Sequence, residues 1–343
     1  MKNYLQHISN LNKKKPVVAT QDIVDTRGIK LVQKGERIDE LQAEKLANAQ
    51  LIAPLDGSLS IGEPFSPDTL ERDLKENVYS DFSYRIIFES AKVESELRAC
   101  CEHLYSHPQL WIKLKVLSYQ LPKVYQNALF CAWMSIILGQ KNQLSETELY
   151  RGFIIALFHD IGLLDITPQI LAKAEPTVME KRVIETHPQL SHAFLSTVDT
   201  LHRDIPRAAL EHHERIDGSG YPSGKVGRQL GRWGQMINLL DTTNAIYRKH
   251  FKPRRRTMGD VIPIIEMSTL PLFGGYAYSL VDVLDTCEKT DSCSTPREKI
   301  ASLVDIMKKQ HEEISGFLDI TGTFIDTFGL ARENARLFAV LNV

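Results

Sequence analysis

Residues Glu211-His212-His213-Glu214-Arg215-Ile216-Asp217-Gly218-Ser219-Gly220-Tyr221-Pro222 are the stretch around which the chain is organised. Two adjacent histidines follow an apolar run, and a glycine-rich turn closed by proline comes after them. Neighbouring residues of a helix point about 100° apart, because about 3.6 residues make one turn. His212 and His213 therefore suit two neighbouring metal ions, or one ion at a helix end. Gly218 and Gly220 supply the backbone angles that a tight turn needs.

Length and composition are those of an ordinary globular chain. The sequence has 343 residues, of which 43% are hydrophobic and 24% are charged, and its formal net charge is -2. At roughly 150 residues per domain, this length predicts two domains. The small net charge gives no indication of a nucleic-acid polymer or a membrane as partner. The longest apolar stretches, such as 153–158 and 128–138, are too short or too interrupted to cross a bilayer.

The N-terminal residues and the cysteines favour a cytoplasmic protein. Residues 1–20 are mostly polar and contain three consecutive lysines and only a four-residue apolar run, which is unlike a signal peptide. The five cysteines include no Cys-x-x-Cys pair, so reduced thiols are the simplest interpretation. Cys287 and Cys293 could form a labile disulfide, although two unpaired thiols are favoured.

Residues 1–63 are predicted to form a small α/β domain. Short strands are expected at 16–20, 29–32 and 59–61, because these segments are rich in β-forming residues and are separated by turn residues. The apolar positions between Ile38 and Ala49 follow the 3.6-residue period of an amphipathic helix. The segment has no cluster of histidine, cysteine or acidic residues that would make a site. Regulation, dimerisation or simple packing is therefore its expected role.

Helices are predicted to dominate the rest of the chain. Residues 64–110 are expected to be a proline-containing linker with leading helices, and residues 111–343 an all-α domain. Ser145 and Glu148 have the spacing of a capping box at the start of one of these helices. The fold class is therefore mainly α. Past Pro253, further helices would cover the site or form a homodimer contact, near residues 257–269, 278–289, 296–316 and 320–342.

Four short motifs have the composition of one metal site: His159-Asp160, His187-Pro188, His212-His213 and Asp241. An acid at the end of an apolar run is costly to bury unless it is paired or bound to a cation. Imidazole and carboxylate are the ligands expected for Fe, Mn or Zn, and a carboxylate can bridge two ions. Each motif alone also has a structural interpretation, since a single histidine is commonly capped or solvated and a buried acid can pair with arginine.

Taken in this order, the motifs resemble those of the HD-GYP subgroup of HD-domain phosphohydrolases. The resemblance covers about residues 115–255, and the block from Glu211 to Pro222 is its most specific part. It implies an all-α domain with two or three metal ions, often iron or manganese. It also implies hydrolysis of a cyclic dinucleotide, most often cyclic di-GMP, to a linear dinucleotide in bacterial signalling.

The resemblance also assigns the site residues. His159 and Asp160 would be the catalytic pair, with Asp160 bridging two ions. The whole implied ligand set is His159, Asp160, His187, His212, His213 and Asp241. Gly220, Tyr221 and Pro222 match the subgroup's signature loop, which would contact a protein partner. A packing role for Tyr221 is an equally open interpretation.

A basic run follows the Asp241 helix and includes Lys252, Arg254 and Arg255. Members of the subgroup carry phosphate-contacting basic residues near this place, so the resemblance implies substrate binding here. The fork of an arginine side chain matches the geometry of a phosphate. A run of like charges is also commonly a solvated surface, and this second interpretation stays open.

The chain departs from the pattern of the subgroup at four positions. The subgroup places Glu and, four residues later, His on one face of the helix before His-Asp, and here these positions hold Lys123 and Asn127. Leu163 replaces a lysine, and Asn244 replaces a frequent second acid. An amide is a weak ligand for a transition metal, and a protonated lysine repels cations, so no third ion is expected.

Two classes of function remain after these departures. Lys123 offers the hypothesis of an ion pair with Asp241 or Asp160, which would place a positive charge where the subgroup has a metal. The first class is a phosphodiesterase with two divalent ions, Fe or Mn or another divalent metal. The second is a degenerate relative that binds a nucleotide or a protein without turnover. The retained ligands and signature loop favour the enzyme.

Overall fold

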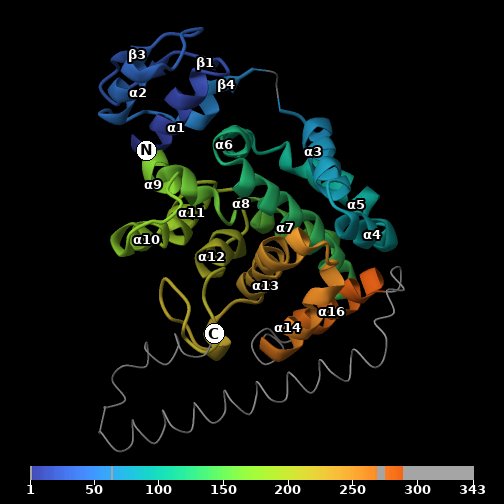
Figure 1. The fold of residues 1–343 in the computed structure, drawn as a ribbon. Coiled ribbons are helices and arrows are strands. Elements are labelled where there is room, and N and C mark those ends of the chain that lie inside the picture. The colour runs from blue at the N-terminus through green and yellow to red at the C-terminus, as the bar shows by residue number, and fades with distance from the viewer. Residues whose placement is uncertain (1, 63–64, 269–274, 289–343) are drawn as a thin grey trace, which may run out of the picture. The chain divides into compact units, whose positions relative to one another are not determined.

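Helices make up most of the computed structural model, which describes residues 2–62, 65–268 and 275–288 (Figure 1). The helices expected at 296–316 and 320–342, and Cys293, lie outside these residues. Within the described residues the strands form only two antiparallel pairs, β1 (Val17–Ala19) with β4 (Leu59–Ile61) and β2 (Ile23–Val24) with β3 (Lys30–Val32). The predicted mainly α fold class is confirmed.

The N-terminal segment contains its three predicted strands and one helix that the sequence pattern does not predict. The predicted helix is α2 (Glu40–Ala47), which Asp39 caps by accepting hydrogen bonds from two backbone N–H groups. The unpredicted helix is α1 (Lys2–Asn12). Its apolar residues are too dispersed to stand out in the sequence, yet their spacing places them on one helix face, where all are buried: Tyr4, Leu5, Ile8 and Leu11.

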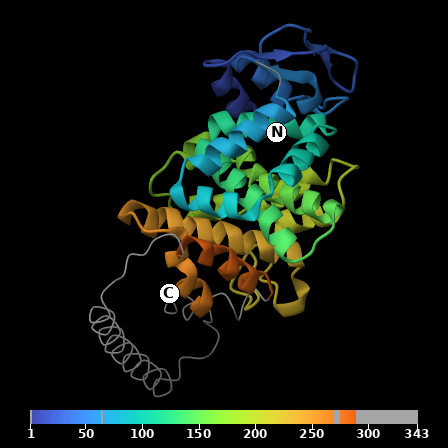
Figure 2. The same ribbon diagram turned by 90° about the vertical axis from the view of Figure 1, so that its right-hand side faces the viewer.

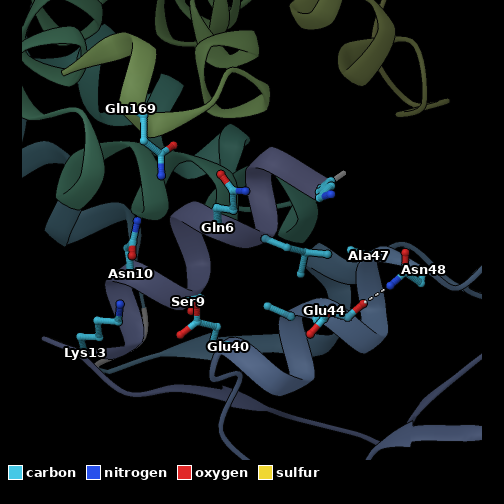
Figure 3. Close-up of a pocket in the computed structure, with 12 residues that line it drawn as sticks. Gln6, Ser9, Asn10, Lys13, Glu40, Glu44, Ala47, Asn48 and Gln169 are labelled. Atoms are coloured by element: carbon cyan, nitrogen blue, oxygen red, sulfur yellow. Dashed lines mark hydrogen bonds between the residues drawn. The ribbon is translucent and has the colours of Figure 1, made fainter. Parts of the chain in front are cut away.

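The helix α1 contacts the segment that follows His159-Asp160 in the chain. The Asn3 side-chain amide donates to the Asp165 carbonyl at 2.7 Å, and His7 Nε2 lies 3.0 Å from the Ile166 carbonyl oxygen. A polar cavity of about 400 Å³ lies between α1 and α2, and Figure 3 shows Gln169 of α9 (Pro168–Leu171) beside it. The proposed boundary at residue 63 is therefore crossed by close contacts, and an independent N-terminal domain stays a prediction.

Two long apolar helices, α7 (Pro122–Lys141) and α8 (Glu146–Phe158), form the centre of the core. Trp133 and Phe153 are among the large side chains that they bury completely. Pro122 separates α7 from α6 (Pro108–Gln120). Ser145 begins α8 in a capping box with Glu148, as predicted. Figure 2 shows α3 (Pro67–Tyr79), α4 (Phe82–Ala91) and α5 (Glu94–Leu104), coloured blue to cyan, in front of this core.

The remaining helices complete the surroundings of α7 and α8. The segment 176–198 is divided into two helices, because Pro188 has no N–H to donate to the carbonyl of residue 184 and its ring would clash with that carbonyl in a continuous helix. The resulting helices and those that follow are α10 (Val178–Ile184), α11 (His187–Leu195), α12 (Asp204–Glu211), α13 (Arg232–Ile246), α14 (Ile262–Ser268) and α16 (Gly275–Glu288). None of the described helices has the length and apolar character needed to span a membrane.

Candidate metal centre

Three helix ends meet at the predicted metal site. His159 is the C-cap of α8, His187 begins α11, and His212 is the C-cap of α12. The three helices pack against one another or through the short 3-10 helix η2 (Ile161–Asp165). Four residues, which we call the ligand cluster, thereby bring their ligand atoms within 4.8 Å of one another: Asp160, His187, His212 and His213.

Gly162 allows α11 to approach the end of α8. A Cβ atom at this position would lie 2.3 Å from the His187 carbonyl oxygen and 2.5 Å from the Ser191 backbone nitrogen. The Gly162 N–H instead donates to the Ser191 hydroxyl at 2.9 Å. The glycine is therefore needed for close packing, and this packing sets the position of His187 relative to Asp160.

Each of three imidazoles is oriented by a backbone carbonyl three residues earlier. The Nδ1 atoms of His159, His187 and His212 lie 2.8, 2.8 and 2.7 Å from the carbonyl oxygens of Ala156, Ile184 and Ala209, respectively. The last carbonyls of a helix lack partners within the helix, so a ring N–H satisfies one of them. With Nδ1 protonated and bonded in this way, Nε2 carries the lone pair that a metal ion requires.

The Asp160 carboxylate lies between these imidazoles. Its Oδ1 atom is 3.0 Å from His187 Nε2 and 3.4 Å from His212 Nε2, and its Oδ2 atom is 3.2 Å from His159 Nε2. Oδ1 therefore faces two imidazoles, and Oδ2 faces a third. A carboxylate in this position has the arrangement needed to bridge two ions.

His159 shows that the donor set fits a metal ion. Its Nε2 atom is buried and makes no hydrogen bond, although it faces the Asp160 carboxylate. A buried polar atom without a partner is costly and is rare in native proteins. A divalent ion would satisfy this nitrogen, and a set of imidazole and carboxylate ligands is appropriate for Fe, Mn or Zn.

Burial and mutual contact determine the protonation of the site. Burial would raise the pKa of the Asp160 carboxyl, but the imidazoles of His159, His187 and His212 hold it well below its usual value. Burial lowers the pKa of His212 and, together with the neighbouring imidazoles, lowers the pKa of His213 to about 2. Burial would also lower the pKa of His159, but the Asp160 carboxylate raises it to about 9. Metal binding is therefore expected to displace a proton from His159.

The signature loop (Gly220-Tyr221-Pro222) covers one side of the ligand cluster. The Tyr221 ring stacks on the His213 ring with centroids 4.7 Å apart and an interplanar angle of 26°. A Cβ atom at Gly220 would lie 2.4 Å from both the Arg215 nitrogen and the His213 carbonyl oxygen, so only glycine fits there. The loop therefore restrains the His213 imidazole. Contact between the loop and a protein partner stays a prediction.

Glu214 holds the segment that follows this loop and Asn238 holds the backbone of the double histidine, and the sequence alone assigns no role to either. The buried Glu214 carboxylate accepts hydrogen bonds from the Ser223 N–H at 2.6 Å and the Lys225 N–H at 2.9 Å. The Asn238 amide on α13 donates to the His212 carbonyl at 2.7 Å. Glu214 is adjacent to the double histidine in the sequence, and this position is the only signal that indicates its importance.

Asp241 is held by Asn127 and not by Lys123. The Asn127 Nδ2 atom donates to Asp241 Oδ1 at 2.6 Å. Lys123 is exposed, and none of the ion pairs among the described residues includes it. The hypothesis that Lys123 pairs with Asp241 or Asp160 is therefore wrong. Its ammonium group stays in water at the first turn of α7, where it incurs no desolvation cost.

The basic run lies on the surface at the end of α13. Lys252 forms an ion pair with Asp81 at 2.9 Å, Arg254 donates to the His250 carbonyl, and Arg255 is exposed. Leu163, which stands where the subgroup has lysine, is buried. The structure gives Lys252 and Arg254 structural partners within the chain. Substrate binding by Lys252, Arg254 and Arg255 stays a prediction.

Comparisons with known proteins agree with these observations. Residues 102–270 match the family model described as "HD domain". The chain is similar to the cyclic di-GMP phosphodiesterase PdeB of Borreliella burgdorferi, with 26% identity over 195 residues, which are 55% of this chain and 51% of that protein. It is also similar to a cyclic di-GMP phosphodiesterase of Pseudomonas aeruginosa, with 28% identity over 141 residues, or 41% and 34% of the two chains.

A third relative differs in the substrate that its name states. It is the 3'3'-cGAMP-specific phosphodiesterase 3 of Vibrio cholerae, which is 31% identical over 104 residues, or 30% of this chain and 22% of that protein. The chain thus spans about half or less of the length of these relatives.

Proposed function

We propose that the chain is a member of the HD-domain phosphohydrolases, in their HD-GYP subgroup, and that it is a metal-dependent phosphodiesterase that hydrolyses a cyclic dinucleotide to a linear one. Cyclic di-GMP is the first candidate, since two of the relatives described above are named for it. The observation that carries the proposal is the ligand cluster, in which buried imidazole nitrogens and both oxygens of Asp160 converge.

Two divalent ions, Fe or Mn, are proposed to occupy the centre. His159, Asp160 and Asp241 would hold one ion. Asp160 and the three histidines of the ligand cluster would hold the second ion, so that Asp160 would be a ligand of both. Such ions, when bound, would supply a nucleophile derived from water near neutral pH and would stabilise the negative charge that develops on the oxygen atoms around phosphorus. The exposed basic residues Lys252, Arg254 and Arg255 are proposed to attract the phosphates.

The chain's own contribution to the reaction is to hold these groups in fixed orientations. The carbonyl contacts of Nδ1 aim the Nε2 atoms of His159, His187 and His212 at Asp160. The signature loop restrains His213 by stacking. Ligands that are oriented before an ion binds lose little freedom on binding, and this preorganisation favours both affinity and correct geometry.

One observation favours a second candidate function, binding without turnover. Asn127 occupies a position where the subgroup has a histidine ligand, and its amide nitrogen donates to Asp241. A centre with fewer ions could retain a nucleotide or contact a protein through the signature loop, yet fail to activate water. A homodimer that forms through the helices expected past Pro253 is also proposed.

A turnover experiment separates the two functions. Metal-free protein is loaded with Mn²⁺, or with Fe²⁺ under reducing conditions, and is incubated with cyclic di-GMP, cyclic di-AMP and 3'3'-cGAMP. Chromatography with mass detection measures the linear products. We expect one of the three substrates to be hydrolysed by the wild type and by His202→Ala, which changes an exposed histidine, but not by His212→Ala. Absence of any linear product from metal-loaded protein would leave binding as the function.

A further inference from the structure

Asp241 lies at the end of a chain of hydrogen bonds that begins on a different helix. Asn127 of α7 donates to Asp241 at 2.6 Å, and Asn244 of α13 donates to the Asn127 Oδ1 atom at 2.7 Å. The Tyr84 hydroxyl of α4 donates to the Asn244 Oδ1 atom at 2.5 Å. Asp241 and Asn244 are three residues apart on α13, so both face α7 from one side of that helix.

The charge of Asp241 determines the direction of this chain. An ionised carboxylate can only accept, so Asn127 must turn its NH₂ group toward Asp241 and its oxygen toward Asn244. Asn244 must then turn its own NH₂ group toward Asn127, and its oxygen receives the Tyr84 hydroxyl. Only this orientation of the two amides leaves every donor facing an acceptor. The Asn127 oxygen, which could otherwise bind a metal, is therefore already used.

Tyr84 is a fixed donor at the start of the chain. Its side chain is 3% exposed, and its ring packs against Phe130 and Trp133 with centroids 5.0 and 5.7 Å away. Burial raises the pKa of the Tyr84 phenol above its usual value, so the hydroxyl keeps its proton. Tyr84 belongs to the first turn of α4. A movement of α4 relative to α13 would lengthen the first hydrogen bond of the chain.

We propose that Tyr84, Asn244 and Asn127 form an amide relay that positions the Asp241 carboxylate as a metal ligand in a centre of two ions. This inference rests on the proposed metal-dependent function. The relay supplies a neutral N–H donor to one oxygen of Asp241 and leaves the second oxygen for an ion. The substitution at Asn127 is then a replacement of a metal contact by a hydrogen bond, and not simply the loss of a ligand. Tyr84, Asn244 and Asn127 are positioning residues, because they act through Asp241.

Titration of metal-free protein with Mn²⁺, followed by calorimetry and by elemental analysis, tests the relay. The wild type should bind two ions with distinguishable affinities. Tyr84→Phe removes the hydroxyl and keeps the ring, and it should weaken binding of the Asp241-dependent ion by up to about 10-fold, because loss of a ligand's direct hydrogen-bond partner costs about 10-fold or more and Tyr84 acts on Asp241 through two amides. The affinity of the other ion should not change.

A matched variant separates this effect from a general loss of stability. Tyr4 is also 3% exposed, and its hydroxyl also donates to a side-chain oxygen, that of Asp56, at 2.5 Å. Tyr4→Phe also removes a buried hydroxyl and should lower the melting temperature, but it should leave Mn²⁺ binding unchanged. Should Tyr84→Phe fail to fold, Asn244→Ala tests the next hydrogen bond with the same titration.

The double variant Tyr84→Phe/Asn244→Ala provides the sharpest outcome. If both residues act through Asp241, the double variant should bind Mn²⁺ as Asn244→Ala alone does. Additive losses of affinity, or unchanged binding in a folded Tyr84→Phe protein, would overturn the relay and leave the metal centre in place. Three bound ions in the wild type would also overturn it. A wild type that binds no Mn²⁺, Fe²⁺ or Zn²⁺ would overturn the metal-dependent function together with the relay.

Discussion

Substitution of Gly162 by alanine tests whether close helix packing sets the geometry of the metal centre. Gly162 does not have a positive φ, so the change introduces no backbone strain and acts only through the added methyl group. That group would lie 2.3 Å from the His187 carbonyl oxygen and 2.5 Å from the Ser191 nitrogen. Both neighbours are backbone atoms, which cannot rotate away, so α11 must move as a body.

The size of this movement follows from contact distances. Ordinary contacts between heavy atoms are near 3.5 Å, so α11 must withdraw by about 1 Å. Overpacking of this kind costs about 1–3 kcal/mol of unfolding free energy. His187 moves with its helix, whereas metal–ligand distances tolerate only about 0.2 Å. We therefore expect Mn²⁺ affinity to fall by at least about 10-fold.

Chemical denaturation and Mn²⁺ titration of Gly162→Ala measure the two effects. The control is Gly57→Ala, because a Cβ atom at Gly57 meets nothing within 4 Å and its φ is also not positive. Gly57→Ala should leave metal affinity unchanged and should stabilise the fold slightly, by about 0.4–1 kcal/mol, through a less flexible unfolded chain. Wild-type stability and metal affinity in Gly162→Ala would refute the packing argument.

Four further predictions concern the loop, the loss of stability at low pH and the metal ions. Glu214→Gln removes a charged acceptor of two backbone N–H groups. It should lower the free energy of unfolding, measured by denaturation, by about 1–3 kcal/mol. It should also speed hydrogen exchange of the loop amides. Burial would raise the pKa of the Glu211 carboxyl, but contacts with Lys225 and others lower it. Ionised Glu211 therefore stabilises the fold fully above its unfolded-state pKa of about 4.3. This stabilisation is lost as the pH falls through the lower pKa of Glu211 in the folded protein. Lys225→Met should therefore destabilise more at pH near 7 than at pH near 3 in urea titrations. Mn²⁺ at about 100 times the dissociation constant of a site should stabilise the wild type by about 2.7 kcal/mol for each ion bound, measured in thermal melts, and His212→Ala, which lacks a ligand of one ion only, should gain about half as much as the wild type. Asn127→His should add a ligand and raise the bound metal measured by elemental analysis, and an unchanged metal count would contradict this.

The sequence predicts those parts of the site that depend on local order. His159-Asp160, His187-Pro188 and His212-His213 each stand at a helix end, where apolar periodicity stops, and the structure brings all three motifs together. The tight turn at Gly220 follows from composition in the same way, since only glycine tolerates the close backbone contacts there. Local rules are sufficient because each feature involves residues near one another in the chain.

The rest depends on contacts between distant segments. Asn127 and Asp241 are 114 positions apart, and no local pattern indicates which residue of α7 faces Asp241. The charge of Lys123 suggested a pair, but the first turn of α7 leaves this side chain in water. The sequence pattern does not predict the helix α1, for a related reason. Its apolar face is buried by packing against other elements, mainly α2 and also α6 and η2, and the short apolar spacing alone does not distinguish it from a polar terminus.

The carbonyl contacts of the imidazoles have a mechanical consequence. His159 and His212 each bond to a carbonyl of their own helix, so neither ring can turn independently of the helix that carries it. The spacing of their Nε2 atoms is therefore a direct function of how far the ends of α8 and α12 are separated. Any force on the chain that changes this separation, including one applied far from the centre, changes ligand spacing by the same amount. Metal occupancy thereby becomes a sensitive measure of the distance between two helix ends.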